Sequence, residues 1–134
     1  MKRVEVVAAV LKKEGKIFCA QRKDEGPLAR KWEFPGGKIE AGESKEEALA
    51  RELYEELNIE IQVGDYIMTV EHQYPTFHIT MHAFYCDLHD EKILLNEHLD
   101  SKWLSPTELS QMDWAEADIP ILETVSGFLS PDGR

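Results

Sequence analysis

Three glutamates stand close together near the middle of the chain, at positions 52, 55 and 56. Residues three and four apart share one face of an α-helix, so a helix here would present three carboxylates together. Like charges at this spacing destabilise a helix by about 0.2–0.5 kcal/mol per pair, which indicates a compensating cation. Mg²⁺ prefers oxygen ligands and is usually held between a few carboxylates and substrate phosphates. The alternative is an acidic, solvent-exposed helix face, and three glutamates alone favour that alternative.

A glycine-rich loop before these glutamates strengthens the metal interpretation. Residues 34–43 read Phe-Pro-Gly-Gly-Lys-Ile-Glu-Ala-Gly-Glu. Glycines permit tight turns and let a ligand approach the backbone closely. An ordinary surface loop would have the same composition, so the meaning of this loop depends on the segment that follows it.

The helix that must position the glutamates is predicted by its own residues. Ser44 suits an N-cap, and Glu47, three positions on, completes a capping box. Leucines recur at helical spacing on the side roughly opposite the three glutamates. Asn58 tolerates the left-handed conformation with which helices often end. We therefore predict a helix over 44–57 that buries a leucine stripe and presents carboxylates on its other face.

The remaining elements place this helix between strands. Apolar and alternating patterns predict strands at 4–11, 17–20, 59–63, 66–73 and 77–88, with a turn at 13–16 and a loop over 23–43. Capping residues predict a short helix from Ser105 and a last helix from Pro120, whose apolar stripe is Ile121, Leu122, Val125, Phe128 and Leu129. Residues 130–134 are expected to fray. The order favours an α/β fold, with helices on both faces of a sheet.

Composition limits the classes of protein to consider. The 134 residues suit a single domain over 1–134, and no stretch approaches the ~20 apolar residues of a membrane span. A formal net charge of −11 disfavours nucleic-acid binding but permits a phosphate-bearing substrate that carries a cation. Cys19 and Cys86 lie in separate apolar runs and are expected to be buried free thiols. With no signal peptide at the start, we expect a cytoplasmic protein.

The loop and the helix together resemble the signature of the Nudix hydrolase family. In this signature five residues separate Gly from Glu, as Gly37 and Glu43 are separated, and Arg51 and Glu52 follow seven residues later. The other positions in register are Leu53, Glu55, Glu56 and Ile59. Asn58 stands where the family has Gly, and the left-handed cap is expected to survive this change.

The resemblance covers nearly the whole chain and is greatest to the MutT branch, in particular to bacterial CTP pyrophosphohydrolases and 8-oxo-dGTP diphosphatases. Segments 34–40 and 115–120 carry it. It implies an α/β/α sandwich around a mixed sheet, and Mg²⁺-dependent cleavage of a nucleoside triphosphate into monophosphate and pyrophosphate, with Mn²⁺ as a substitute. The substrates implied are (d)CTP or an oxidised dNTP. The alternatives are ADP-ribose, a dinucleotide, or a non-catalytic nucleotide-binding module, although a decayed module should have lost signature glutamates.

The resemblance also implies roles for the signature residues. Glu55, Glu56 and the carbonyl of Gly36 would hold metal, and Glu52 would be a ligand or the general base that activates water. Arg51 would pair with Glu43 and so orient the ligands. Glu97 is a second candidate for ligand or base, and a polar loop residue is an equally good interpretation of it. The sequence does not choose between Glu52 and Glu97 as the base.

Substrate contacts are expected outside the signature helix. Arg22 and Lys38 are cations suited to phosphate, whereas Lys23 and Lys31 have the look of plain surface charge. Phe34 could line the nucleotide pocket and Phe77 could pack near the base, with buried core as the alternative for both. Asp118 is expected to contact the nucleobase of the substrate, and a helix N-cap is its alternative role. The expected partner is a small nucleotide, and the sequence leaves monomer and homodimer open.

Overall fold

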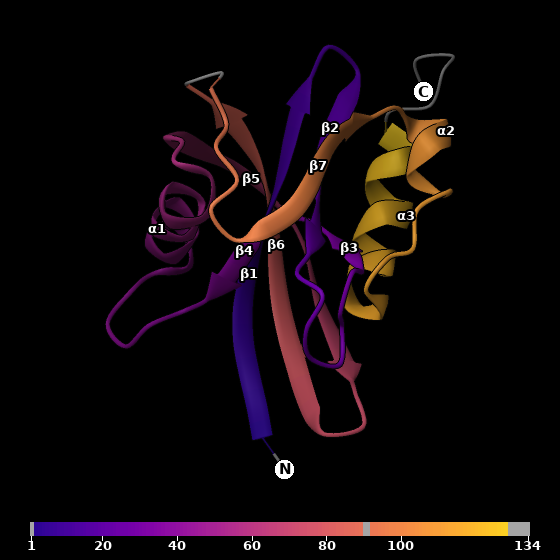
Figure 1. Cartoon of the computed structure of the whole chain (residues 1–134). Coiled ribbons are helices and arrows are strands. Elements are labelled where there is room, and N and C mark those ends of the chain that lie inside the picture. The colour runs from indigo at the N-terminus through magenta and orange to yellow at the C-terminus, as the bar shows by residue number, and fades with distance from the viewer. Residues whose placement is uncertain (1, 90–91, 129–134) are drawn as a thin grey trace.

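The computed structural model describes residues 2–89 and 92–128. Its elements, shown in Figure 1, are β1 (Lys2–Lys13), β2 (Lys16–Arg22), β3 (Trp32–Glu33), β4 (Gly36–Lys38), α1 (Lys45–Leu57), β5 (Ile61–Gln73), β6 (Phe77–Leu88), β7 (His98–Leu104), α2 (Pro106–Leu109), the 3₁₀ turn η1 (Glu116–Asp118) and α3 (Ile119–Phe128). None of the described helices is long and apolar enough to cross a membrane.

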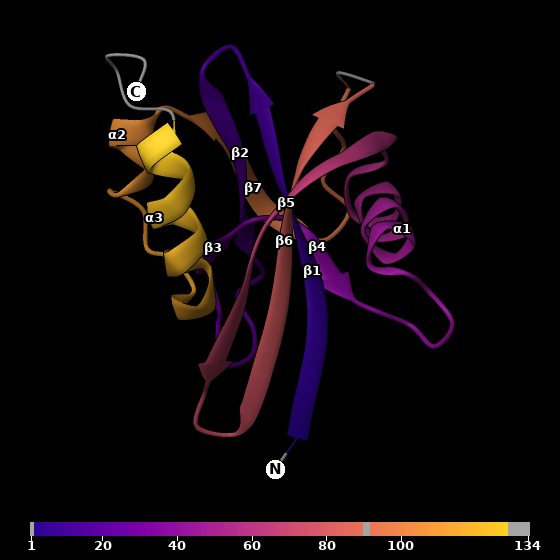
Figure 2. The same cartoon turned by 180° about the vertical axis from the view of Figure 1, so that it is seen from behind.

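The strands form a mixed sheet around β1. Along most of its length β1 runs parallel to β6, which pairs with β5, while β4 pairs antiparallel with β1. At its far end β1 turns into β2, and β2 pairs with β3 and β7. Helix α1 covers one face, and α2 and α3 cover the other, as the front and back views show (Figures 1 and 2). The predicted α/β/α sandwich around a mixed sheet is confirmed.

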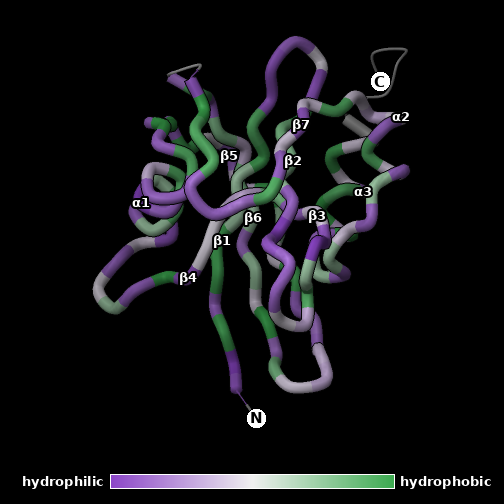
Figure 3. Tube along the Cα trace, viewed as in Figure 1, coloured by the Kyte–Doolittle hydropathy of each residue, from purple (hydrophilic) through white to green (hydrophobic). Residues whose placement is uncertain are grey.

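Strand β1 is buried on both faces. Val7, Ala9 and Leu11 pack in the cluster that contains the leucines of α1. The alternate residues Val6, Ala8 and Val10 pack in the cluster that contains the apolar residues of α3. A strand covered on both sides has a continuous apolar run instead of an alternating one. The trace of β1 is accordingly hydrophobic along its middle and hydrophilic toward its two ends (Figure 3).

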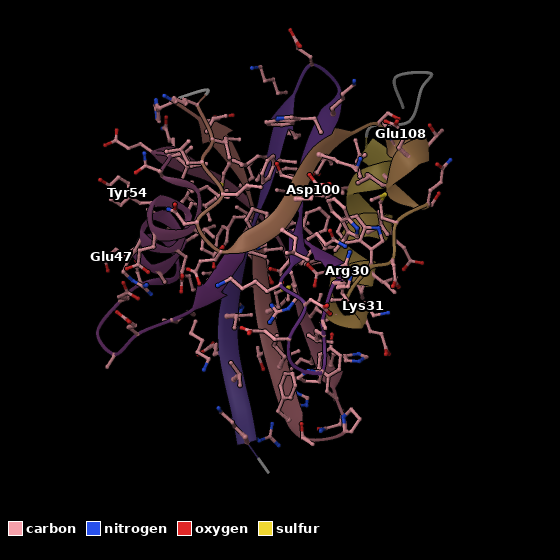
Figure 4. The ribbon with its side chains drawn as sticks, viewed as in Figure 1. Arg30, Lys31, Glu47, Tyr54, Asp100 and Glu108 are labelled. Carbon is pink, nitrogen blue, oxygen red and sulfur yellow. The ribbon has the colours of Figure 1, made fainter. Side chains whose placement is uncertain are left out.

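Helix α1 is built as its sequence predicts. The Ser44 hydroxyl accepts from the Glu47 amide at 3.0 Å, and the Glu47 carboxylate accepts from the Ser44 amide at 2.8 Å. Asn58 ends the helix with φ 57° and ψ 36°, the left-handed conformation. Leu49, Leu53 and Leu57 are buried completely. Glu47 and Tyr54 point away from the sheet on the outer side of the helix (Figure 4).

Two predictions about strands are wrong and one strand was not predicted, each for a non-local reason. The loop predicted over 23–43 contains β3 and β4, which are only two and three residues long and exist because β2 and β1 offer paired edges. The two strands predicted over 59–73 are one strand, β5, whose register shifts near Tyr66 at bulges. Strand β7 was not predicted, because its residues are mostly polar and it owes its conformation to pairing with β2.

The C-terminal predictions are confirmed where the structure describes the residues. Helix α2 starts with Pro106, and the Glu108 carboxylate accepts from the Ser105 amide at 2.9 Å. In α3, Ile121, Leu122 and Val125 are buried, as the predicted stripe requires. The side chain of Phe128, and the whole of 129–134, lie outside the described residues. Cys19 and Cys86 are both buried free thiols.

Candidate active site

Strand β4 is a glycine strand because α1 and β1 both press against it. A Cβ at Gly36 would overlap the backbone of β1 at Val7, and a Cβ at Gly37 would overlap the Glu52 carboxylate. The Ala9 amide donates to Pro35 O, so Gly36 occupies a non-hydrogen-bonded pair opposite β1. Its own amide and carbonyl therefore point away from β1. The amide donates to Glu56 on α1.

Arg51 is the centre of one group of charges on α1. Its guanidinium donates to both Glu43 oxygens, at 2.7 and 3.0 Å, to Glu55 at 3.0 Å and to the Lys38 carbonyl at 2.9 Å. The pKa of Glu43 is lowered, first by its hydrogen bond to Arg51. The predicted Arg51–Glu43 pair is thus present, and it ties the glycine-rich loop to the helix. Glu40, also 3.5 Å from Arg51, is mostly exposed.

A polar pocket of about 240 Å³ lies beside the second half of α1. Its walls come from the end of β2 and the following loop, from β3, from α1 and from the start of β7. The lining residues are Arg22, Lys23, Glu25, Glu33, Glu56, Glu97 and His98. Four carboxylates face two cations and one histidine, so negative charge predominates. Segments far apart in the sequence therefore converge on a site that suits a cation and an anionic ligand together.

Glu56 is the most strongly perturbed carboxyl in this pocket. Its pKa is raised to about 9, first by burial and then by the charges of Glu33, Glu52 and Glu97, while the Gly36 amide opposes the shift. Its Oε1 atom is buried and has no hydrogen-bond partner. The pKa of Glu52 is also raised, first by burial, with Glu55 and Glu97 contributing. Buried, under-neutralised carboxylates of this kind are a physical reason to expect a functional site.

Glu33 joins the two nitrogen-bearing side chains of the pocket. Its Oε1 accepts from Arg22 Nη1 at 2.9 Å, and its Oε2 accepts from His98 Nε2 at 2.9 Å. Strand pairing explains the arrangement, because β2 places Ala20 opposite Glu33 and Arg22 opposite His98. Arg22 Nε and His98 Nδ1 are buried without partners. The pocket thus holds three unpaired polar atoms, one each on Arg22, Glu56 and His98.

Aromatic and acidic residues gather next to this pocket, toward α3. Asp118 is 2% exposed, and its Oδ2 accepts from the Phe34 amide at 2.9 Å across the fold. Burial, followed by the charge of Glu33, raises the pKa of Asp118 well above its ordinary value. Phe34 packs on Trp114 with ring centroids 4.9 Å apart. The hydrogen bond described for Asp118 thus fixes β3 to η1, and does not cap α3.

The structure brings some of the predicted residues together and separates others. Arg22, Glu56 and Glu97 line the pocket, and Glu52 lies over Gly37 nearby. Glu55 instead points toward Arg51, with 53% of its side chain exposed. The remaining predicted residues lie elsewhere: the exposed Lys38 on β4, the buried Phe34, and Phe77, whose ring stacks on Tyr74 at 4.9 Å.

Four pocket residues were missed or undervalued by the sequence reasoning: Glu25, Glu33 and His98 were missed, and Lys23 was undervalued. Glu33 and His98 were not singled out, since their role depends on how β2 pairs with β3 and β7. The one local signal was that each stands next to a residue already chosen, Phe34 and Glu97. Lys23 was assigned to plain surface charge, yet it lines the pocket. Lys31 pairs with Asp113 at 2.8 Å, as a surface charge would.

The donor set of the pocket fits a hard divalent cation. The candidate ligands are carboxylate oxygens, and the unpaired Glu56 Oε1 has the burial and charge that a cation would compensate. Within residues 2–89 and 92–128, no three His, Cys, Asp or Glu side chains form a ready-made metal-binding group.

Comparison with known proteins places the chain in a family. Residues 6–124 match the family model described as NUDIX domain. The chain is 43% identical over 123 residues to the CTP pyrophosphohydrolase of Escherichia coli (strain K12), covering 92% of this chain and 91% of that protein. It is 32% identical over 123 residues to the 8-oxo-dGTP diphosphatase of the same strain, covering 91% and 95%.

Solved structures agree with the sequence comparison. The solution structure of the E. coli ORF135 protein has a TM-score of 0.84 and 42% identity, covering 97% of this chain and 93% of that one. The chain therefore belongs to the Nudix family and is a Nudix hydrolase. Nudix hydrolases require a divalent metal ion, in agreement with the carboxylates gathered around the pocket.

Proposed function

We propose that this protein is a Mg²⁺-dependent nucleoside triphosphate pyrophosphohydrolase, acting on (d)CTP or on an oxidised dNTP such as 8-oxo-dGTP. The observation that carries the proposal is the buried, unpaired Glu56 carboxylate, surrounded by acids and placed in the same pocket as Arg22. This arrangement suits the joint binding of a cation and a phosphate chain. The names of the two E. coli relatives support the choice of substrates.

The candidate ligands are Glu52, Glu55, Glu56, Glu97 and the carbonyl of Gly36. A bound Mg²⁺, or Mn²⁺ in its place, would neutralise phosphate charge and lower the pKa of a water molecule. Glu56 is held in place by the Gly36 amide, and Glu55 would have to exchange its contact with Arg51 for the cation. Arg51 does not bind the cation but acts indirectly, because its guanidinium holds Glu43 and the Lys38 carbonyl in place.

In the proposed reaction, water attacks a phosphorus atom, and nucleoside monophosphate and pyrophosphate leave. Glu52 accepts the proton of the attacking water, because its pKa is raised toward the working range of a base and it lies over the glycine strand. Glu97 is the alternative base. Arg22 keeps guanidinium N–H groups for the substrate phosphates after Glu33 has taken one, and Lys38 offers a further cation from β4.

The nucleobase is proposed to bind near Asp118, with Phe34 and Phe77 as its candidate aromatic contacts. An ionised Asp118 would accept from the exocyclic amine of cytosine. Its raised pKa favours the protonated form, which could also donate to a carbonyl of an oxidised purine. One residue therefore accommodates both proposed substrates in two protonation states.

The test is product analysis on a panel of nucleotides. Purified protein is incubated with CTP, dCTP, dGTP, 8-oxo-dGTP and ADP-ribose, with Mg²⁺, Mn²⁺ or EDTA, and the products are separated by ion-exchange chromatography. We expect monophosphate and pyrophosphate in equal amounts, the highest kcat/KM on a cytosine or oxidised nucleotide, and no turnover in EDTA. Release of orthophosphate, a preference for ADP-ribose, or full activity in EDTA would contradict the proposal.

We further propose a reducing, cytoplasmic setting and a monomer or homodimer. The two buried free thiols support the first point.

A further inference from the structure

Residues 92–97, which precede β7, lie against the C-terminal end of α1. The last four carbonyls of a helix have no partners inside the helix and need donors from elsewhere. In α1 the Tyr54 carbonyl accepts from the Asn58 amide at 2.9 Å, which is a local cap. The other three carbonyls are reached from the loop at 92–97. In Figure 1 this segment runs beside α1 before it crosses into β7.

Asn96 supplies two of these three donors. Its backbone amide donates to Glu56 O at 3.0 Å, and its side-chain Nδ2 donates to Glu55 O at 2.9 Å. The Leu94 amide supplies the third, to Leu57 O at 3.0 Å. Asn96 is therefore hydrogen-bonded to the backbone of the helical turn that carries the pocket carboxylate Glu56.

His98 fixes the other side of Glu97. It starts β7 opposite Arg22, and only 5% of its side chain is exposed. Its Nε2 donates to Glu33, which in turn holds Arg22. Glu97 itself is exposed, and in the described part of the chain no hydrogen bond holds its carboxylate. Its place on the pocket wall is thus set by its two neighbours and not by contacts of its own.

We propose that Asn96 and His98 are positioning residues that act through Glu97, Asn96 by fastening the loop to the last turn of α1 and His98 by anchoring it to Glu33. The inference rests on the proposed function, since it gives Glu97 a part in the reaction. It resolves the two interpretations of Glu97 in favour of a working carboxylate. It also explains why the N–H donors of Leu94 and Asn96, in an exposed loop, bond to carbonyls at the end of a helix.

The test is a double-mutant cycle with two readouts. Asn96→Ala removes the Nδ2 donor, and we expect kcat/KM to fall by about tenfold to 100-fold, the range for residues that orient metal ligands. The dissociation constant for Mn²⁺, measured without substrate from the electron paramagnetic resonance of free Mn²⁺, should rise by about tenfold. In a Glu97→Gln background the same change should alter either quantity by less than about twofold, because residues that act as a unit are not additive. His98→Asn should show the same dependence on Glu97.

Asn58→Ala is the matched control. It weakens the same helix end through the left-handed cap, and Asn58 is not among the residues that line the pocket. It should lower the melting temperature without changing Mn²⁺ affinity. Additive effects of Asn96→Ala and Glu97→Gln, in a wild-type enzyme that turns over with metal, would overturn the positioning role alone. A wild-type protein that neither binds Mn²⁺ nor hydrolyses a triphosphate would overturn the proposed function instead.

Discussion

Helix α1 carries two groups of charged side chains that differ in how their charge is balanced. The Arg51 guanidinium donates hydrogen bonds to Glu43, to Glu55 and to the Lys38 carbonyl, and the pKa of Glu43 is lowered. Around Glu56, one turn further on, burial and neighbouring acids raise the pKa to about 9 and leave an oxygen unpaired. Both groups combine an arginine with several glutamates.

The difference separates a structural charge cluster from a ligand-binding one. A group whose charges are already neutralised gains little from an added cation, whereas a group with excess buried negative charge gains much. The Arg51 cluster therefore ties the glycine-rich loop to α1, whereas the Glu56 pocket has the charge that an added cation would neutralise. Proximity in sequence does not distinguish the two, but the direction of the pKa shift does.

The sharpest test compares neighbouring glutamates across the two groups. Glu56→Gln should lower kcat/KM by about 10³-fold, because a metal ion contributes several kcal/mol of charge stabilisation. The change should leave the melting temperature of the metal-free protein equal at neutral pH, where the Glu56 carboxyl is protonated, and higher near pH 9, because a buried Gln cannot ionise. Glu55→Gln, on the exposed side, should cost about tenfold. Steady-state kinetics and thermal melts of both variants measure these effects. Near-normal turnover in Glu56→Gln would count against the pocket as the metal site.

Arg51→Lys tests the balanced cluster. A lysine cannot hold both Glu43 oxygens and the Lys38 carbonyl at once, because it lacks the planar fork of the guanidinium. We expect a loss of about tenfold to 100-fold in kcat/KM together with a lower melting temperature. Glu56→Gln differs from this variant in stability, because its activity is expected to fall without a lower melting temperature. A variant that loses activity but keeps its melting temperature would place Arg51 in the chemistry itself.

Asp118→Asn extends the comparison to the proposed base site. Asn retains an acceptor for the Phe34 amide but adds a fixed donor and loses the titratable proton. We expect the ratio of kcat/KM for CTP to that for 8-oxo-dGTP to change by about tenfold, with metal dependence intact. Parallel assays with the two substrates measure it. An unchanged ratio accompanied by a lower melting temperature would leave Asp118 with only its structural bond to β3.

The pH dependence of stability should report the unbalanced group. The Glu56 carboxyl has an ordinary pKa of 4.5 when unfolded and about 9 when folded, so the folded state retains a proton that the unfolded state loses. Its contribution to stability is complete below pH 4.5 and is lost as the pH rises toward 9. In EDTA the melting temperature should fall by about 5 °C between pH 6 and 9. Glu56→Gln should flatten this slope, Arg51→Lys should not, and a rise in stability over this range would contradict the raised pKa.

The smallest effect is expected at the helix end. Asn58→Gly should be neutral or stabilising by up to about 1 kcal/mol, because Gly meets no Cβ clash at φ 57°. Asn58→Val should destabilise by about 1–2 kcal/mol, since a β-branched residue resists this conformation. Melting temperatures of the two variants measure the difference. A Val variant more stable than wild type would refute the left-handed cap.

The parts of the molecule that could be predicted are those determined by residues close in sequence. The capping box needs only Ser44 and Glu47, and the left-handed end needs only Asn58, so α1 was predicted with its caps. The pairing of Arg51 with Glu43 followed from a family signature confined to one loop and one helix. The order of elements favoured helices on both faces of a sheet, and the resemblance to the Nudix family implied the α/β/α sandwich around a mixed sheet.

The parts that could not be predicted depend on strand pairing between distant segments. Glu33 belongs to a two-residue strand, and nothing in its neighbourhood shows that β2 will place it between Arg22 and His98. The same holds for Asn96, whose donors meet carbonyls some 40 positions earlier in the chain. The sequence pattern identifies the side chains of a site more readily than the contacts that hold them.

Burial and then the charge of Glu33 raise the pKa of both Glu56 and Asp118, and the shared influence of Glu33 links the pocket thermodynamically to the neighbouring Asp118. A cation bound near Glu56 would offset the field of Glu33 and so favour the ionised form of Asp118. Reciprocity then requires that a base which binds ionised Asp118 tightens the hold on the cation by the same factor. Free metal concentration would thereby bias which nucleobase the enzyme prefers, without any change in the residues that touch the base.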